Sequence, residues 1–178
     1  YPTIVVSFSG GKDSGVLLNA VLKFKRDRSL PNRIVVFHQD FEAQYAKTTE
    51  FVERMYAQVI STGDCIPLWV CLPVASRCAV SNYQMYWNPW DETKRHLWVR
   101  PIPQHDWVIR EHNNPFEFYK WGMPQEEFYK SVGGWVSRKY GKSIVLVGIR
   151  TQESLNRFRA VYSQWKESVD GVRKWTTS

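Results

Sequence analysis

The residues best suited to chemistry lie near the start of the chain, in the run Ser9, Gly10, Gly11, Lys12, Asp13 and Ser14. The apolar residues 4–8 before this run are typical of a buried strand, and the apolar spacing from residue 16 onward predicts a helix. A turn between a strand and a helix presents backbone N–H groups and the positive end of the helix dipole to an anion. The sequence therefore predicts a phosphate-binding turn at residues 9–14.

Each residue type in this turn suits a phosphate ligand. The two glycines can adopt positive φ and bring the backbone close to an anion, Lys12 adds a cation, and Ser9 and Ser14 add hydroxyl donors. Asp13 can cap the helix or help to hold a Mg²⁺ that accompanies the phosphates. We expect Lys12 and Asp13 to act in catalysis as well as in binding. The alternative is a glycine turn with a serine cap and no ligand.

Length and composition limit the class of protein. A chain of 178 residues with 43% hydrophobic residues is long enough for one globular domain, residues 1–178. No apolar stretch approaches the roughly 20 residues that span a bilayer, and no signal peptide opens the chain, so we expect a cytoplasmic protein with no membrane partner. Because the chain starts at Tyr1 rather than Met, we also expect a segment trimmed at both ends.

Charge and cysteine content narrow the partners. The net charge of +7 favours anionic partners such as nucleotides or nucleic acid. Cys65, Cys71 and Cys78 make an odd count without a C-x-x-C pair, so we interpret them as reduced thiols and expect no zinc or iron–sulfur cluster.

Strand and helix patterns alternate along the chain. Residues 33–38, 65–72 and 143–148 are predicted strands, and helices are predicted at about 43–60, at about 125–140 and after residue 150. This alternation predicts an α/β fold with a doubly wound, mainly parallel, Rossmann-like sheet whose ligand crevice lies at the carboxyl ends of the strands. By that rule, three polar clusters lie together at the carboxyl edge of the sheet, which we call the rim: residues 9–14, 38–42 and 148–159.

A long segment, about residues 75–141, interrupts the alternation and is rich in tryptophan, tyrosine and phenylalanine. We call it the aromatic segment. Its rings can stack nucleic-acid bases beside Lys94, Arg95 and Arg100, or they can form a local core or bind a partner protein. We favour the local core or protein interface, because the basic and aromatic residues do not alternate along one defined element.

A second anion site is predicted at residues 148–159, where a glycine ends a strand and Thr151 can cap the next helix. Guanidinium groups bind phosphate or sulfate in a bidentate manner, so Arg150 and Arg157 are candidates for a second anionic group of the ligand. The alternative is that each arginine pairs with Glu153 or lies in solvent. His38 can be a general base oriented by Asp40, although a structural hydrogen bond is the interpretation that we favour for it.

The first turn matches the S-G-G-x-D-S signature of the PP-loop superfamily, whose members resemble adenine nucleotide α-hydrolases. Residues 148–157, Gly-Ile-Arg-Thr-Gln-Glu-Ser-Leu-Asn-Arg, resemble the G-[IL]-R-x-x-E-S-x-x-R segment of its phosphoadenosine phosphosulfate reductase-like branch. Asp40-Phe41-Glu42 and the following Thr48-Thr49 also resemble this branch, which carries an acidic residue after its second strand and threonine in the next helix. The tryptophan-rich segment, with residues 69–73, looks most similar to the subgroup of immunoglobulin-binding regulators.

This resemblance implies an adenine nucleotide, ATP or phosphoadenosine phosphosulfate, lying across the strand ends. Its phosphates would occupy residues 9–14, the backbone near Phe37 and His38 would read the adenine, and Asp40 would be among the nucleotide contacts. An anionic group would reach Arg150, with a catalytic role, and Arg157.

The chain departs from the reductases in one respect, because it contains no E-C-G-[LI]-H motif with a nucleophilic cysteine. Either the tail that carries this cysteine is trimmed from the sequence, or the protein does not reduce sulfonucleotides. We favour an enzyme that acts at the phosphate or sulfate end of the nucleotide. The alternatives are a nucleotide sensor that regulates a partner protein or DNA without turnover, and a subunit of a DNA sulfur-modification or defence system.

Overall fold

The structure is a computed structural model that describes residues 1–63, 65–163, 168–169 and 172–173. Its centre is a five-stranded sheet with the order β6-β3-β2-β1-β7, in which every neighbouring pair is parallel. The strands are β1 (Thr3–Ser7), β2 (Arg33–Gln39), β3 (Cys65–Val70), β6 (Val108–Ile109) and β7 (Ser143–Val147).

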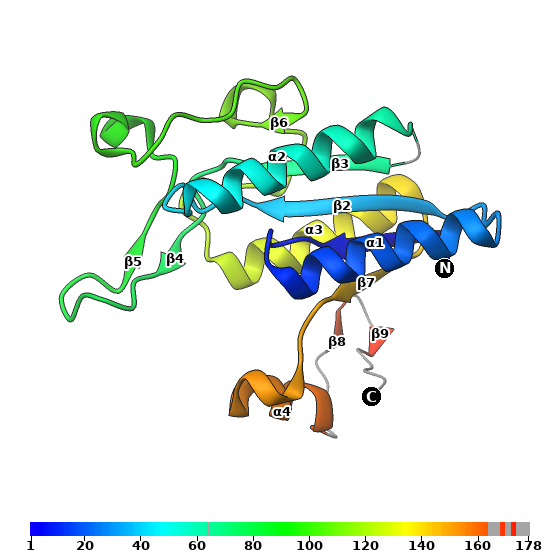
Figure 1. Cartoon of the computed structure of the whole chain (residues 1–178). Helices are drawn as coiled ribbons and strands as arrows, with labels where there is room; N and C mark the ends of the chain where they lie inside the picture. Colours follow the sequence, from blue (N-terminus) through cyan, green and yellow to red (C-terminus); the bar gives the residue numbers. More distant parts are fainter. Residues whose placement is uncertain (64, 164–167, 170–171, 174–178) are drawn as a thin grey trace.

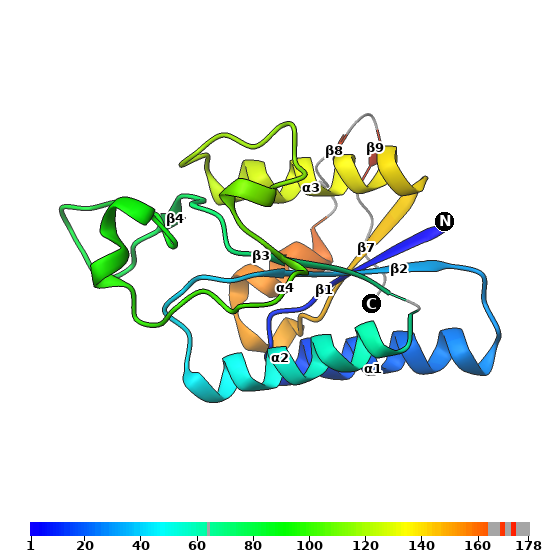
Figure 2. The ribbon, with the colours of Figure 1, turned by 90° about the horizontal axis from the view of Figure 1, so that it is seen from above.

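Helices cover both faces of the sheet (Figure 2). Helices α1 (Lys12–Asp27) and α2 (Ala46–Ser61) lie on one face, and α3 (Gln125–Tyr140) lies on the other. Each face has its own core: Val6, Val36 and Leu18 belong to the first, and Val35, Phe128 and Trp135 belong to the second. The predicted doubly wound α/β fold is confirmed. It follows from the largely buried, β-branched strands β1 and β2, whereas the edge strand β7 is partly exposed.

Strand order reverses between β1 and β7. The chain leaves β1 through α1 and α2 toward β2 and β3, and it returns through α3 to β7 on the other side of β1. Open parallel sheets bind ligands at the carboxyl ends of the strands beside such a reversal. The turn after β1 and the loop after β7 therefore lie in the position where a ligand is expected.

The aromatic segment contributes to the main body of the fold. It contains the short hairpin of β4 (Ser76–Arg77) and β5 (Tyr86–Trp87), the 3₁₀ turns η1 (Glu92–Leu97) and η2 (Glu111–Asn113), strand β6 and helix α3. The sequence predicts helix α3 but not β6, because two residues carry no periodic signal.

Most rings of the aromatic segment pack internally. Phe116, Phe128 and Trp135 share the core under α3, and Trp90 is buried in the core on the opposite face. These rings thus join the two main cores of the sheet and do not form a separate local core, whereas Tyr83 is fully exposed.

After β7 the chain forms the 3₁₀ turn η3 (Thr151–Glu153) and helix α4 (Leu155–Tyr162), followed by the short strands β8 (Ser168–Val169) and β9 (Val172–Arg173). Helix α4 lies beyond the edge of the sheet and buries none of its residues (Figure 1). Among the described residues, no helix combines the length and apolar character required to cross a membrane.

His38 lies inside the core beneath α2. Its ring contacts Trp69 with centroids 5.3 Å apart, and its Nδ1 is 2.8 Å from the carbonyl oxygen of Phe8. Burial lowers the pKa of His38, and this effect outweighs the nearby Asp40 carboxylate and the Phe8 carbonyl, which both favour the charged ring. The structural hydrogen bond expected for this residue is present.

The buried imidazole makes stability depend on pH. Because the pKa of His38 is lower in the folded than in the unfolded chain, unfolding takes up a proton below pH 6.5, and stability is lost as the pH falls. We expect the free energy of unfolding to fall between pH 6.5 and 5.5, with His38 contributing up to about 1.4 kcal/mol per pH unit. Urea titrations at several pH values measure this slope.

The control is His38→Asn, whose amide can still donate to the Phe8 carbonyl but does not titrate. This variant should show a smaller slope over the same pH range. Equal slopes in the two proteins would show that His38 does not cause the loss of stability.

Candidate functional site

The turn after β1 ends at Gly11, which forms the N-cap of α1 without a side-chain cap. The backbone N–H groups of Lys12, Asp13 and Ser14 donate to no acceptor in the described part of the chain, as expected for the first turn of a helix. Three N–H groups therefore face outward where the helix dipole is positive, an arrangement that binds anions.

Ser14 fixes the shape of this turn. Its hydroxyl donates to the Gly11 carbonyl at 2.9 Å, accepts from the backbone N–H of Ser9 at 3.2 Å, and lies 3.0 Å from the Ser9 hydroxyl. Ser14 is buried, whereas Ser9 and Lys12 are exposed. Ser14 thus orders the turn, and the Lys12 side chain is free to approach a ligand.

Gly10 is required by both conformation and space. Its φ is +79°, and an added Cβ would lie 2.6 Å from Cγ2 of Val52 and 3.0 Å from Cγ2 of Thr48. Both neighbours belong to α2, so the turn is seated against this helix. A larger residue would be strained and would push the turn away from α2.

The loop after β7 approaches the same turn through Gly148. A Cβ at this position would lie 3.0 Å from the carbonyl carbon and oxygen of Asp13 and 3.1 Å from Cα of Ser14. The neighbouring atoms are backbone and have little freedom to move. The glycine therefore allows the two predicted anion-binding segments to touch.

Charged side chains join these segments. Nε of Arg150 donates to the Asp13 carboxylate at 3.0 Å, and Glu153 accepts from the backbone N–H of Arg150 at 3.0 Å and pairs with Arg157. The Arg150 backbone N–H, followed by the Arg157 guanidinium, lowers the pKa of Glu153. The structure thus shows the predicted alternative of pairing with Glu153, and it brings Lys12, Asp13, Arg150 and Arg157 into one region.

Two details of the predicted helix starts are wrong. Asp13 does not cap α1, because its carboxylate is directed to Arg150. Thr151 does not cap the last helix, because a 3₁₀ turn intervenes and α4 begins after Ser154, whose hydroxyl accepts from the backbone N–H of Arg157 at 3.2 Å. Capping preferences alone could not locate the break between the turn and the helix.

Asp40 is a fully buried hydrogen-bond acceptor at the end of β2. Its carboxylate accepts from the backbone N–H of Glu42 at 2.8 Å, from Nε1 of Trp69 at 2.9 Å and from the Arg100 guanidinium. Its carbonyl oxygen accepts from Nε1 of Trp90 at 2.8 Å. We therefore assign the Asp40 side chain to the structure of the rim rather than to contact with a ligand.

Glu42, which the sequence places in the polar cluster at residues 38–42 without a role of its own, extends this arrangement. Its two carboxylate oxygens accept from the backbone N–H groups of Trp90 and Val99, each at 3.1 Å. Both Glu42 and Trp90 have positive φ, +63° and +60°, a strained conformation for side chains of this size. These contacts hold the aromatic segment against the end of β2.

The expected adenine contacts lie on β2. The carbonyl oxygen of Phe37 accepts from the backbone N–H of Phe8 at 2.8 Å, so the sheet already uses it. The next residue on that face of the strand is Gln39, which is buried, and its Oε1 and Nε2 have no partner in the described residues. The sequence places Gln39 in the polar cluster at residues 38–42 but does not assign it to the ligand.

The cysteines offer no activated thiol near the turn. Cys71 is buried, and desolvation raises the pKa of its thiol well above the usual value. Within the described part of the chain, no three His, Cys, Asp or Glu side chains gather as a metal-binding group.

The close approach at Gly148 can be tested by substitution. Gly148→Ala should lower the free energy of unfolding by about 1–3 kcal/mol, because the new methyl group overlaps the backbone of Asp13. Gly133→Ala, inside α3 with no atom within 4 Å of the new Cβ, should be neutral or stabilising. Urea unfolding of both variants measures the difference, and equal effects would contradict the close packing of the two segments.

The buried carboxylate gives a second test. Asp40→Ala should destabilise the chain by about 3–5 kcal/mol, because it leaves the Arg100 guanidinium largely buried without its counter-charge. Asp27→Ala removes the exposed partner of Lys23 and should cost no more than about 1 kcal/mol. Chemical denaturation of the two variants makes the comparison, and an Asp40→Ala loss as small as that of the control would rule out this role.

The region that contains this turn is similar to a known protein family. Residues 3–67 match the phosphoadenosine phosphosulfate reductase domain. The uncharacterized protein YbdN of Escherichia coli (strain K12) is 35% identical over 180 residues, which cover 99% of this chain and 41% of that protein. The chain thus spans about two fifths of the length of this relative, and no solved structure matches it significantly.

The matched region contains β1, the turn at residues 9–14, α1, β2 and α2, but not the loop after β7 that contacts the turn. The family binds adenine nucleotides. Residues 3–67 are therefore similar to a phosphoadenosine phosphosulfate reductase domain, and the parallel sheet agrees with the doubly wound fold expected for the PP-loop superfamily.

Proposed function

We propose that this chain binds ATP or phosphoadenosine phosphosulfate at residues 9–14 and acts at the phosphate or sulfate end of the nucleotide. The observation that carries the proposal is the set of three outward N–H groups at Lys12, Asp13 and Ser14, located where the strand order reverses. The family match to this same region supports an adenine nucleotide rather than another anion.

Lys12 and the turn N–H groups would stabilise negative charge that develops on the phosphates during cleavage. Arg150 is held 3.0 Å from Asp13 and is about half exposed, so a ligand oxyanion can replace the Asp13 carboxylate as its partner. Such an exchange would release Asp13, the one carboxylate in the turn. Arg157, which pairs with Glu153, would contact a second anionic group of the ligand. A Mg²⁺ bound with the phosphates would be held by Asp13 and would neutralise their charge.

We infer that the base lies toward β2. The amide of Gln39 offers one donor and one acceptor that the described residues leave unpaired, and this pair complements an edge of adenine. Backbone groups near Phe37 and His38 are the other expected contacts. The described cysteines supply no nucleophile for reductive cleavage at this site, because Cys71 is buried as a thiol, so the proposal assigns no catalytic cysteine.

Calorimetric titration with ATP plus Mg²⁺ and, separately, with phosphoadenosine phosphosulfate tests the proposal. We expect saturable binding of one nucleotide and at least a tenfold loss of affinity in Lys12→Ala, because a charge-assisted hydrogen bond contributes about 1.5–3 kcal/mol. Lys23→Ala, which removes an exposed cation from the same helix, should bind as the wild type does.

Assays of the same mixtures for pyrophosphate and sulfite identify the chemistry. Pyrophosphate release from ATP indicates an adenylating enzyme. Tight binding of phosphoadenosine phosphosulfate without sulfite indicates a sensor or a reductase whose catalytic tail is missing. Undiminished affinity in both Lys12→Ala and Asp13→Ala would remove the turn from the nucleotide site.

A further inference from the structure

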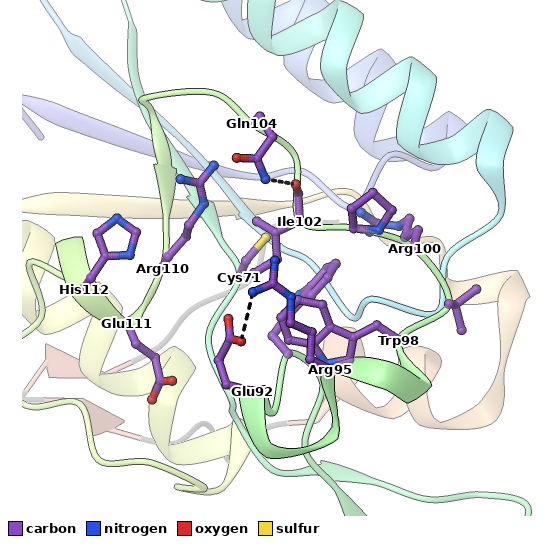
Figure 3. Close-up of a pocket in the computed structure, with 13 residues that line it drawn as sticks. Cys71, Glu92, Arg95, Trp98, Arg100, Ile102, Gln104, Arg110, Glu111 and His112 are labelled. Carbon is purple, nitrogen blue, oxygen red and sulfur yellow. Dashed lines mark hydrogen bonds and ion pairs between the residues drawn. The ribbon is translucent and has the colours of Figure 1, made fainter.

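A cavity of about 710 Å³ lies between Cys71, which follows β3, and residues 90–112 of the aromatic segment (Figure 3). This volume lies in the range of sites for small molecules. The lining of the cavity includes three arginines, two tryptophans and one cysteine: Arg95, Arg100, Arg110, Trp90, Trp98 and Cys71.

The cavity lies apart from the turn at residues 9–14. Cys71 follows the end of β3, Arg110 follows the end of β6, and Arg100 is bound to Asp40 after the end of β2. The turn follows β1, and β2 separates β1 from β3 in the sheet. Neighbouring strands are about 4.8 Å apart, so the end of β3 lies roughly 10 Å from the end of β1.

The arginines are held in place by indole rings and by hydrogen bonds. The guanidinium carbon of Arg100 is 5.0 Å from the centre of the Trp90 ring, and that of Arg95 is 5.6 Å from the centre of the Trp98 ring. Arg110 donates to the Pro103 carbonyl at 2.6 Å. Stacking and hydrogen bonding fix the planes of the guanidinium groups before any ligand arrives.

Several N–H groups of these arginines are left without acceptors. Nε and Nη1 of Arg100 and Nε of Arg110 are buried and have no partner in the described residues. Buried donors without acceptors are rare in folded proteins and are costly when guanidinium groups carry them. A phosphate, sulfate or carboxylate group offers the acceptors that these donors lack, and small movements of the two arginines would present them to it.

Acidic side chains restrict the ligand further. Figure 3 shows Glu111 and His112 on the side of the cavity opposite Trp98, with Glu92 beside Arg95. Two carboxylates, Glu92 and Glu111, thus line the cavity beside its three guanidinium groups. This balance favours a small molecule with one anionic group and disfavours a polyanion such as nucleic acid.

We propose that this cavity binds a small molecule through one oxyanion group, held by Arg100 and Arg110, independently of the turn at residues 9–14. Its place on the same edge of the sheet suits a second substrate or an effector. The proposal goes beyond nucleotide binding and stands even if the turn binds no nucleotide.

Sulfate is the probe that tests this site, because its charge is constant across neutral pH. The arginine Nε–H signals of the ¹⁵N-labelled 178-residue chain are followed by NMR during a sulfate titration at constant ionic strength. We expect the signals of Arg100 and Arg110 to shift and to saturate. Arg110→Gln should weaken the affinity reported by the Arg100 signal about tenfold.

Two control variants test whether the shifts arise from sulfate bound in the cavity. Lys94→Gln removes an exposed cation of η1 that does not line the cavity and should leave the affinity unchanged. Lys12→Ala, in the turn, should also leave the Arg100 and Arg110 shifts unchanged. Arg100 is kept intact because its pair with Asp40 supports the fold.

Shifts that rise linearly without saturation, or that are the same in Arg110→Gln, would overturn the proposal. Shifts that disappear in Lys12→Ala would show that sulfate binds at the turn instead, which also overturns it. If the wild-type chain binds no nucleotide in the calorimetric titrations but its Arg100 and Arg110 signals still saturate with sulfate, only the proposed nucleotide function is contradicted.

Discussion

The buried carboxylate of Asp40 is the interaction on which the rim of this protein depends. It joins the end of β2 to Trp69 of β3 and to Arg100 of the aromatic segment, while the Asp40 carbonyl oxygen binds Trp90. A buried charge is unfavourable unless it is paired and hydrogen-bonded, so these partners must stay together. Asp40 and Arg100 thereby fix how the aromatic segment sits on the sheet.

A second constraint, close backbone packing, shapes the other half of the rim. Gly10 allows the turn after β1 to rest on α2, and Gly148 allows the loop after β7 to touch the start of α1. Arg150 then links the two segments through Asp13. The outward N–H groups of the turn are therefore located by contacts with α2 and with the loop after β7, which is the preorganisation that an anion site needs.

The two halves of the rim differ in how they present positive charge. The turn uses backbone dipoles and the exposed Lys12, whereas the cavity uses guanidinium groups backed by Trp90 and Trp98. Backbone donors suit phosphates of varied shape, and rigid guanidinium groups favour one oxyanion in one orientation. The proposed nucleotide site and the proposed oxyanion site would then lie on one sheet edge without competing.

The sequence by itself determined the parallel sheet, α3 and the turn at residues 9–14, because these depend on local periodicity and on glycine conformation. Only the tertiary structure decided the rest. Strand β6 is too short to leave a pattern, and the partners of Asp40 and Glu42 lie about 30 to 60 residues away along the chain. Burial of His38 and Asp40, and exposure of Lys12, follow from such distant packing, which no local pattern encodes.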